Sequence, residues 1–178
     1  GPLLLQTQLS DDCQVYRRLE VGVRIEQTST EFCLRDSDAL DPKLVAQSYG
    51  DGVEWRTFCC CRNGEVIRTV ADGISSVAGR ADGAPTNLSN IGFNVRVLDP
   101  LEGMSLWVGL RARMEAARTL VAEPIDDFLR AGEGGESALR VLLGHRLAAA
   151  IADGLLVLKT TLGSNSLQGA VLHGPRWR

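Results

Sequence analysis

The fold is decided by residues 99–121, DPLEGMSLWVGLRARMEAARTLV. Asp99 is a typical N-cap, because its carboxylate accepts hydrogen bonds from free backbone N–H groups, and Pro100 suits the first helical position. An apolar stripe recurs at steps of three and four residues: Trp107, Leu110, Met114, Ala117 and Val121. The stretch predicts an amphipathic helix, which we expect to end near Glu123 because Pro124 disfavours helical geometry at the residue before it.

The chain before this helix has the pattern of β-structure. Residues 18–26 alternate, with four apolar side chains on one face, Leu19, Val21, Val23 and Ile25. We expect Glu31–Arg35 to return beside this strand as the second half of an antiparallel hairpin. Asp41–Tyr49 is expected to form a short helix. Ile91–Leu98 alternates again and predicts a last strand that leads directly into the helix at Asp99.

The strongest hairpin signal is at residues 53–70, VEWRTFCCCRNGEVIRTV. Asn63-Gly64 is a favoured type I′ turn, because both residues tolerate a positive φ. This register sets Arg62 opposite Glu65. It also places four side chains on one face: Trp55, Thr57, Cys59 and Cys61. The following segment, Asp72–Asn90, is rich in Gly, Ser, Asp and Asn and predicts a long loop.

The chain after residue 121 is expected to be mostly helical. Ile125–Ala131 predicts a short helix closed by Gly132, and a second helix is expected from Glu136 or Ser137 to Ala152. The β-branched residues of Leu155–Leu162 favour a strand, and Gly163–Arg178 is expected to be a polar tail.

The predicted fold class is α+β, an antiparallel sheet of about five strands packed by the amphipathic helix and followed by a C-terminal helical part. Residues 3–98 form the β-rich unit and residues 99–178 the helical unit, together one compact domain. Gly1-Pro2 is typical of the scar that is left when an expression tag is cleaved.

Composition narrows the function classes. The 178 residues are 44% hydrophobic and carry a net charge of −3, so there is no basic signature of nucleic-acid binding. No apolar run approaches the roughly 18 residues that cross a bilayer, so no membrane partner is predicted. Five cysteines, an odd number, favour an intracellular, reducing compartment, the cytoplasm or the nucleus.

No catalytic residue, metal site or cofactor is predicted. Neighbouring residues on a strand face opposite ways, so at most Cys59 and Cys61 could share a metal, and the C-x-x-C spacing of zinc sites is absent. The histidines, His145 and His173, are remote in sequence. The glycine-rich run 132–137 lacks the preceding strand and the lysine of a phosphate-binding loop.

The leading hypothesis is a non-enzymatic protein-interaction or assembly module, a scaffold or oligomerisation unit whose partner is another protein or a second copy of the chain. The candidate partner-binding residues are Trp107, Leu110, Met114, Val121, Arg176, Trp177 and Arg178, since Trp, Met and Arg are favoured at interfaces. The alternative for the helical stripe is that it covers the chain's own sheet. Two further function hypotheses are an enzyme with Cys59 or Cys61 as nucleophile beside a histidine, and an accessory nucleic-acid-binding scaffold that uses arginines.

Overall fold

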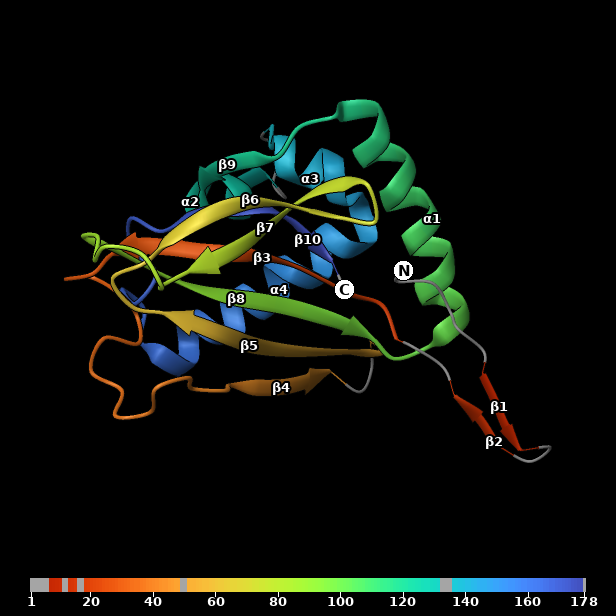
Figure 1. The fold of residues 1–178 in the computed structure, drawn as a ribbon, viewed down its shortest axis with the longest axis horizontal. Coiled ribbons are helices and arrows are strands. Elements are labelled where there is room, and N and C mark those ends of the chain that lie inside the picture. The colour runs from red at the N-terminus through yellow and green to blue at the C-terminus, as the bar shows by residue number, and fades with distance from the viewer. Residues whose placement is uncertain (1–6, 11–12, 16–17, 49–50, 132–135, 178) are drawn as a thin grey trace.

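The computed structural model describes residues 7–10, 13–15, 18–48, 51–131 and 136–177 (Figure 1). Its main sheet is antiparallel and has six strands in the order β4-β5-β8-β3-β10-β9. Their bounds are β3 Glu20–Thr28, β4 Val45–Ser48, β5 Val53–Cys61, β8 Leu88–Val97, β9 Val121–Pro124 and β10 Val171–Trp177. Two further antiparallel sheets have two strands each: β1 (Thr7–Ser10) with β2 (Cys13–Val15), and β6 (Glu65–Ala71) with β7 (Ile74–Arg80). The predicted α+β class is confirmed.

The main sheet is covered differently on its two faces. Helices α3 (Ala138–Leu143) and α4 (His145–Leu162) lie behind it, and the β6–β7 hairpin crosses in front (Figure 1). Helix α1 (Pro100–Ala117) stands at one end of the molecule, and the short α2 (Ile125–Arg130) follows β9. The core joins apolar side chains of the sheet to those of α3 and α4: Val21, Val23, Ile25, Ile91, Phe93, Val95, Leu139, Leu147, Ile151 and Leu155.

The alternation of residues 18–26 is confirmed as β3, but its predicted hairpin partner is wrong. β3 pairs with β8 on one side and β10 on the other, so both of its edges are occupied by remote strands. Glu31–Arg35 forms turns instead. Phe32 and Leu34 are still buried, and the backbone N–H of Cys33 donates to Gln27 Oε1 at 3.0 Å.

The Asn63-Gly64 turn joins β5 to β6, but these strands do not pair. β5 pairs with β4 and β8, and β6 pairs with β7 through a turn at Asp72-Gly73, where both residues have positive φ. Glu65 is therefore opposite Arg80 and not Arg62. The predicted loop at residues 72–90 contains β7 and the start of β8.

A bulge in β5 explains why the four side chains predicted to share one face of that strand do not do so. The pairing of β5 with β8 shifts between Phe58 and Cys61, and Cys59 has a φ of +48°. A bulge adds one residue to a strand and changes the side that later residues face. Cys60 accordingly packs against the core, whereas Cys61 contacts a polar side chain in front of the sheet.

The start of α1 is confirmed and its end is earlier than predicted. Asp99 Oδ1 accepts from the N–H groups of Leu101 at 2.7 Å and Glu102 at 2.9 Å. The helix stops at Ala117, because Arg118 takes a left-handed conformation with a φ of +52° and donates its N–H to Met114 O. Residues 121–124 then form the edge strand β9.

Four other predictions are wrong. The segment predicted as a helix at residues 41–49 contains strand β4, and Tyr49 lies outside the described residues, as does Gly132. The predicted helix 136–152 is split at Gly144, which has a φ of +76°, and its second part, α4, runs through Gly154 to Leu162. The predicted strand 155–162 is thus helical. The predicted tail contains β10, which lies inside the sheet between β3 and β9.

Candidate functional site

The apolar stripe predicted to bind a partner lies largely inside the molecule. Trp107, Leu110 and Met114 are 3%, 0% and 2% exposed. The ring of Trp107 stacks at an angle on that of Trp177, with centroids 5.8 Å apart. Arg113 fastens α1 to α3 by donating to Leu142 O at 2.8 Å and Leu143 O at 2.7 Å. In this conformation a partner reaches these three side chains only by displacing α1.

Three of the other predicted partner-binding residues, Val121, Arg176 and Trp177, belong to strands of the main sheet. Val121 is half-buried on β9, and Trp177 is buried at the end of β10. The guanidinium of Arg176 lies 4.1 Å from the centroid of the Phe58 ring, a cation–π contact. Arg178 lies outside the described residues.

The cysteine run is spread over three environments. Cys59 is exposed, while Cys60 is half-buried and donates its N–H to Asp41 Oδ1 at 3.0 Å. Cys61 is buried and accepts from Arg24 Nη2 at 3.4 Å. Burial, with a smaller contribution from Cys60, raises the pKa of the Cys33 thiol to about 12. Within the part of the chain that the structure describes, no cluster of three or more His, Cys, Asp or Glu side chains is placed to hold a metal ion.

Among the described residues, no hydrogen bond joins either histidine to this run. His145 is exposed at the start of α4. His173 Nε2 lies 3.1 Å from Glu26 Oε1, and Glu26 Oε2 accepts from the N–H of Val66 at 3.0 Å. Burial works to raise the pKa of Glu26, but these hydrogen bonds outweigh it and the pKa lies below its usual value. Glu26 thus links β3 to β10 and to the hairpin strand β6.

A buried arginine lies between the sheet and the β6–β7 hairpin. Arg24 is 1% exposed, and its guanidinium donates to Asn90 Oδ1 and, at 2.8 Å, to Cys59 O. Burial lowers the pKa of Arg24, and the neighbouring Cys61 opposes this. Gly79 of β7 lies so close that a Cβ there would overlap the guanidinium. The polar layer is therefore occupied by contacts that hold the hairpin to the sheet.

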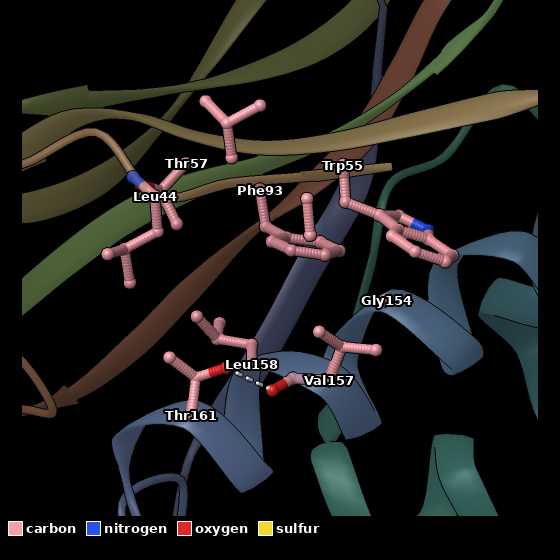
Figure 2. Close-up of a pocket in the computed structure, with 10 residues that line it drawn as sticks. Leu44, Trp55, Thr57, Phe93, Gly154, Val157, Leu158 and Thr161 are labelled. Carbon is pink, nitrogen blue, oxygen red and sulfur yellow. Dashed lines mark hydrogen bonds between the residues drawn. The ribbon is translucent and has the colours of Figure 1, made fainter. Parts of the chain in front are cut away.

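An apolar pocket opens on the opposite face, between the β4–β5 edge of the sheet and α4 (Figure 2). Its volume is about 90 Å³. The sheet side is lined by Leu44, Val45, Ala46, Trp55, Thr57 and Phe93, and the helix side by Gly154, Val157, Leu158 and Thr161. Gly154 admits the Trp55 ring against the helix, since a Cβ there would come within 2.5 Å of Nε1. The pocket exists because α4 continues past Asp153-Gly154.

The polar side-chain atoms that line this pocket are hydrogen-bonded within the chain. Trp55 Nε1 donates to Ala150 O at 2.7 Å. Thr57 Oγ1 accepts from Leu44 N at 2.8 Å and donates to Pro42 O at 3.2 Å. Thr161 Oγ1 donates to Val157 O at 2.8 Å, as the dashed line in Figure 2 shows. What remains for an occupant is therefore apolar contact, because no lining group among these needs a polar partner.

The pocket lies beside an open sheet edge. Among the described strands, β5 is the only one that pairs with β4. Val45 is 60% exposed on this edge, and on α4 Val157 is 39% exposed. Sheet edges present backbone N–H and C=O groups to other chains, and Pro, charged residues or bulges commonly block them. The described residues of β4 include none of these.

Sequence reasoning missed this site. Residues 41–49 were expected to form a helix and residues 155–162 a strand, so the β4 and α4 parts of the pocket were not predicted, whereas the strands that carry Trp55, Thr57 and Phe93 were. One usable signal was Leu155 and Leu158, which continue the apolar spacing of Leu147 and Ile151 across Gly154.

Comparison of the chain with protein-family models, with curated proteins and with solved structures finds no match. Among the helices described, none combines the length and apolarity needed to cross a bilayer.

Proposed function

We propose that this chain is a non-enzymatic protein-interaction module that holds a partner at the β4 edge of its main sheet. The observation that carries the proposal is the apolar pocket at this edge, which adjoins a strand with one paired side. Interfaces place an apolar anchor in such a pocket and surround it with polar groups that exclude water.

The rest of the molecule supports a binding role. Two polar side chains in front of the sheet are engaged in structural hydrogen bonds. Asn90 accepts from Arg24 and donates to Gly64 O at the start of the hairpin. Glu26 bonds His173 and accepts from the N–H of Val66 in the hairpin. The pocket itself contains no titratable side chain among its lining residues. A hydrophobic slot with internally satisfied polar atoms favours retention of an apolar group over its chemical conversion.

The proposal is tested by selecting binders from a random heptapeptide display library. Wild-type protein is compared with Val157→Asp, which puts a charge into the pocket, and with Leu156→Asp as the matched control. Leu156 is 50% exposed on the same helix but does not line the pocket. Thermal unfolding establishes that both variants are folded.

We expect wild type and Leu156→Asp to enrich the same sequences and Val157→Asp to enrich none of them. The proposal fails if wild-type protein enriches no sequence above the uncoated support. It also fails if Val157→Asp retains every peptide that wild type binds.

A further inference from the structure

We infer that the partner segment is an extended peptide that adds to β4 as a further strand and inserts one aliphatic side chain into the pocket. This inference rests on the proposed function and specifies the chemistry of its partner. It is carried by the hydrogen-bonding direction of β4, by the side-chain register at the edge, and by the size of the pocket.

The first step is the direction of the β4 backbone groups. β4 and β5 are antiparallel, with Val45 opposite Arg56 and Gln47 opposite Glu54. The N–H of Thr57 donates to Leu44 O at 2.9 Å, so Leu44 belongs to a hydrogen-bonded pair. In an antiparallel ladder such pairs alternate with pairs whose N–H and C=O groups point away. The backbone groups of Val45 and Gln47 therefore point outward from the sheet.

An extended chain can form hydrogen bonds with outward N–H and C=O groups that recur on alternate residues. A helix satisfies its own backbone and has no groups to offer this edge, whereas a strand has donors and acceptors at the matching spacing. Each outward residue of β4 supplies one donor and one acceptor. The edge thus selects the backbone conformation of its occupant.

The second step is the register of the side chains. Leu44 and Ala46 face α4 and line the pocket, whereas the Gln47 side chain bonds Glu54 on the other side of the sheet. An added strand lies about 4.8 Å beyond β4, and its alternate side chains share the face of Ala46. Those side chains point towards the gap between the sheet edge and Val157. Ala46 is small, which leaves the pocket open from this side.

The third step is the size and polarity of the pocket. A protein cavity of about 150 Å³ holds a benzene ring. The pocket here is about 90 Å³, so it suits a branched aliphatic side chain such as that of Val, Ile or Leu and is too small for an indole. A charged or amide side chain is disfavoured, because it would lose water without gaining a hydrogen bond.

The test uses a peptide selected on wild-type protein, labelled with a fluorophore, with its Kd measured by anisotropy. Val45→Pro removes an outward N–H and leaves the pairing with β5 in place, and Val45→Thr is the matched control that keeps the N–H. We expect Val45→Pro to weaken binding at least about tenfold and Val45→Thr to change it less than about threefold. Replacing the aliphatic anchor of the peptide by Ser is expected to weaken binding by a similar factor.

A second arm keeps the protein unchanged, so that a folding defect in Val45→Pro does not decide the result. The selected peptide is N-methylated at alternate residues, in two versions that block opposite edges of its backbone. One version is expected to lose binding and the other to keep it. Equal binding of both versions, or unchanged affinity for Val45→Pro, overturns the strand inference while the interaction function stands. If the library yields no binder to wild-type protein, the proposed function fails instead.

Two other occupants are distinguishable in the same samples. If sedimentation shows a wild-type dimer that Val45→Pro converts to monomer, the occupant of the β4 edge is a second copy of the chain and not a foreign peptide. If a fluorescent fatty acid binds wild type and Val45→Pro equally but does not bind Val157→Asp, the occupant of the pocket is a fatty acyl chain. Either result overturns the inference.

Discussion

Gly154→Ala is expected to destabilise the protein although alanine is the better helix former. An added Cβ would lie 2.5 Å from Trp55 Nε1 and 2.7 Å from Phe93 Cζ, and closer still to Trp55 Cδ1. Real Cβ atoms do not approach this closely, so the indole has to move. Trp55 is buried on the sheet, and its Nε1 donates to Ala150 O at 2.7 Å. Moving the ring weakens that hydrogen bond.

The size of the effect follows from three contributions. Overpacking a core position costs about 1–3 kcal/mol. Losing one neutral hydrogen bond costs about 1 kcal/mol. Replacing Gly by Ala inside a helix stabilises the helix by about 1 kcal/mol. The free energy of unfolding should therefore fall by about 2 kcal/mol, which for a chain of this size lowers Tm by about 4–8 °C.

Urea unfolding followed by circular dichroism measures this change. The matched control is Gly109→Ala in α1, where the Cβ would first meet Arg113 Nη1, at 3.2 Å. Nη1 is not one of the two Arg113 nitrogens that bond to Leu142 O and Leu143 O, and it has to give by only a few tenths of an ångström, so we expect this variant to be up to about 1 kcal/mol more stable than wild type. The reasoning is refuted if Gly154→Ala is at least as stable as wild type while Gly109→Ala shows its gain.

Arg118→Gly should stabilise the protein by about 0.5–1 kcal/mol, because it relieves a left-handed conformation at the end of α1; urea unfolding that shows no gain would contradict this. Glu26→Gln should destabilise most near neutral pH. The lowered pKa of Glu26 means that its contribution is present above the unfolded value near 4.5 and is lost as the pH falls through the folded value; unfolding of wild type and variant from about pH 7 to pH 3 should therefore converge, and a constant difference would exclude the link. A thiol reagent followed by mass spectrometry should label exposed Cys59 first and Cys33 slowest, since burial holds the pKa of Cys33 at about 12; faster labelling of Cys33 would contradict this order.

Elements specified by local chemistry were predictable from the sequence. The N-cap at Asp99 depends on residues within one turn, and the alternation of β3 and β8 depends on neighbours two positions away. Strand pairing was not predictable in this way. One partner of β3 is β10, which lies more than 140 residues further along the chain. The sequence of β10 has only a weak alternation of apolar and polar residues, so it was not expected to be a strand.

Glycine and proline were the signals most open to misreading. Gly154 has the sequence pattern of a helix stop, yet the structure uses it to admit Trp55 from β5. Pro124 was expected to end α1, but the helix ends at Ala117 because Arg118 takes a left-handed conformation. In both cases a local rule was overridden by a contact or a backbone conformation that a single sequence pattern does not reveal.

The candidate site was missed for the same reason. It is lined by residues 44–46, 55, 57 and 93 on the sheet and by residues 154, 157, 158 and 161 on α4. The secondary structure expected for residues 44–46 and for residues 155–162 was wrong. The α1 side chains Trp107, Leu110 and Met114 are buried, as the alternative reading of the stripe expected, and their role in partner binding stays a prediction. We place the proposed partner site at the β4 edge.

The most direct measurement of the central claim is amide hydrogen exchange of β4 with and without a selected peptide. We expect exchange at Val45 and Gln47 to slow at least about tenfold on binding, because their outward N–H groups gain acceptors. Exchange at Ala46, which already faces β5, should change little. Unchanged exchange at Val45 and Gln47 under saturating peptide would contradict the claim that a partner binds at this edge as a strand.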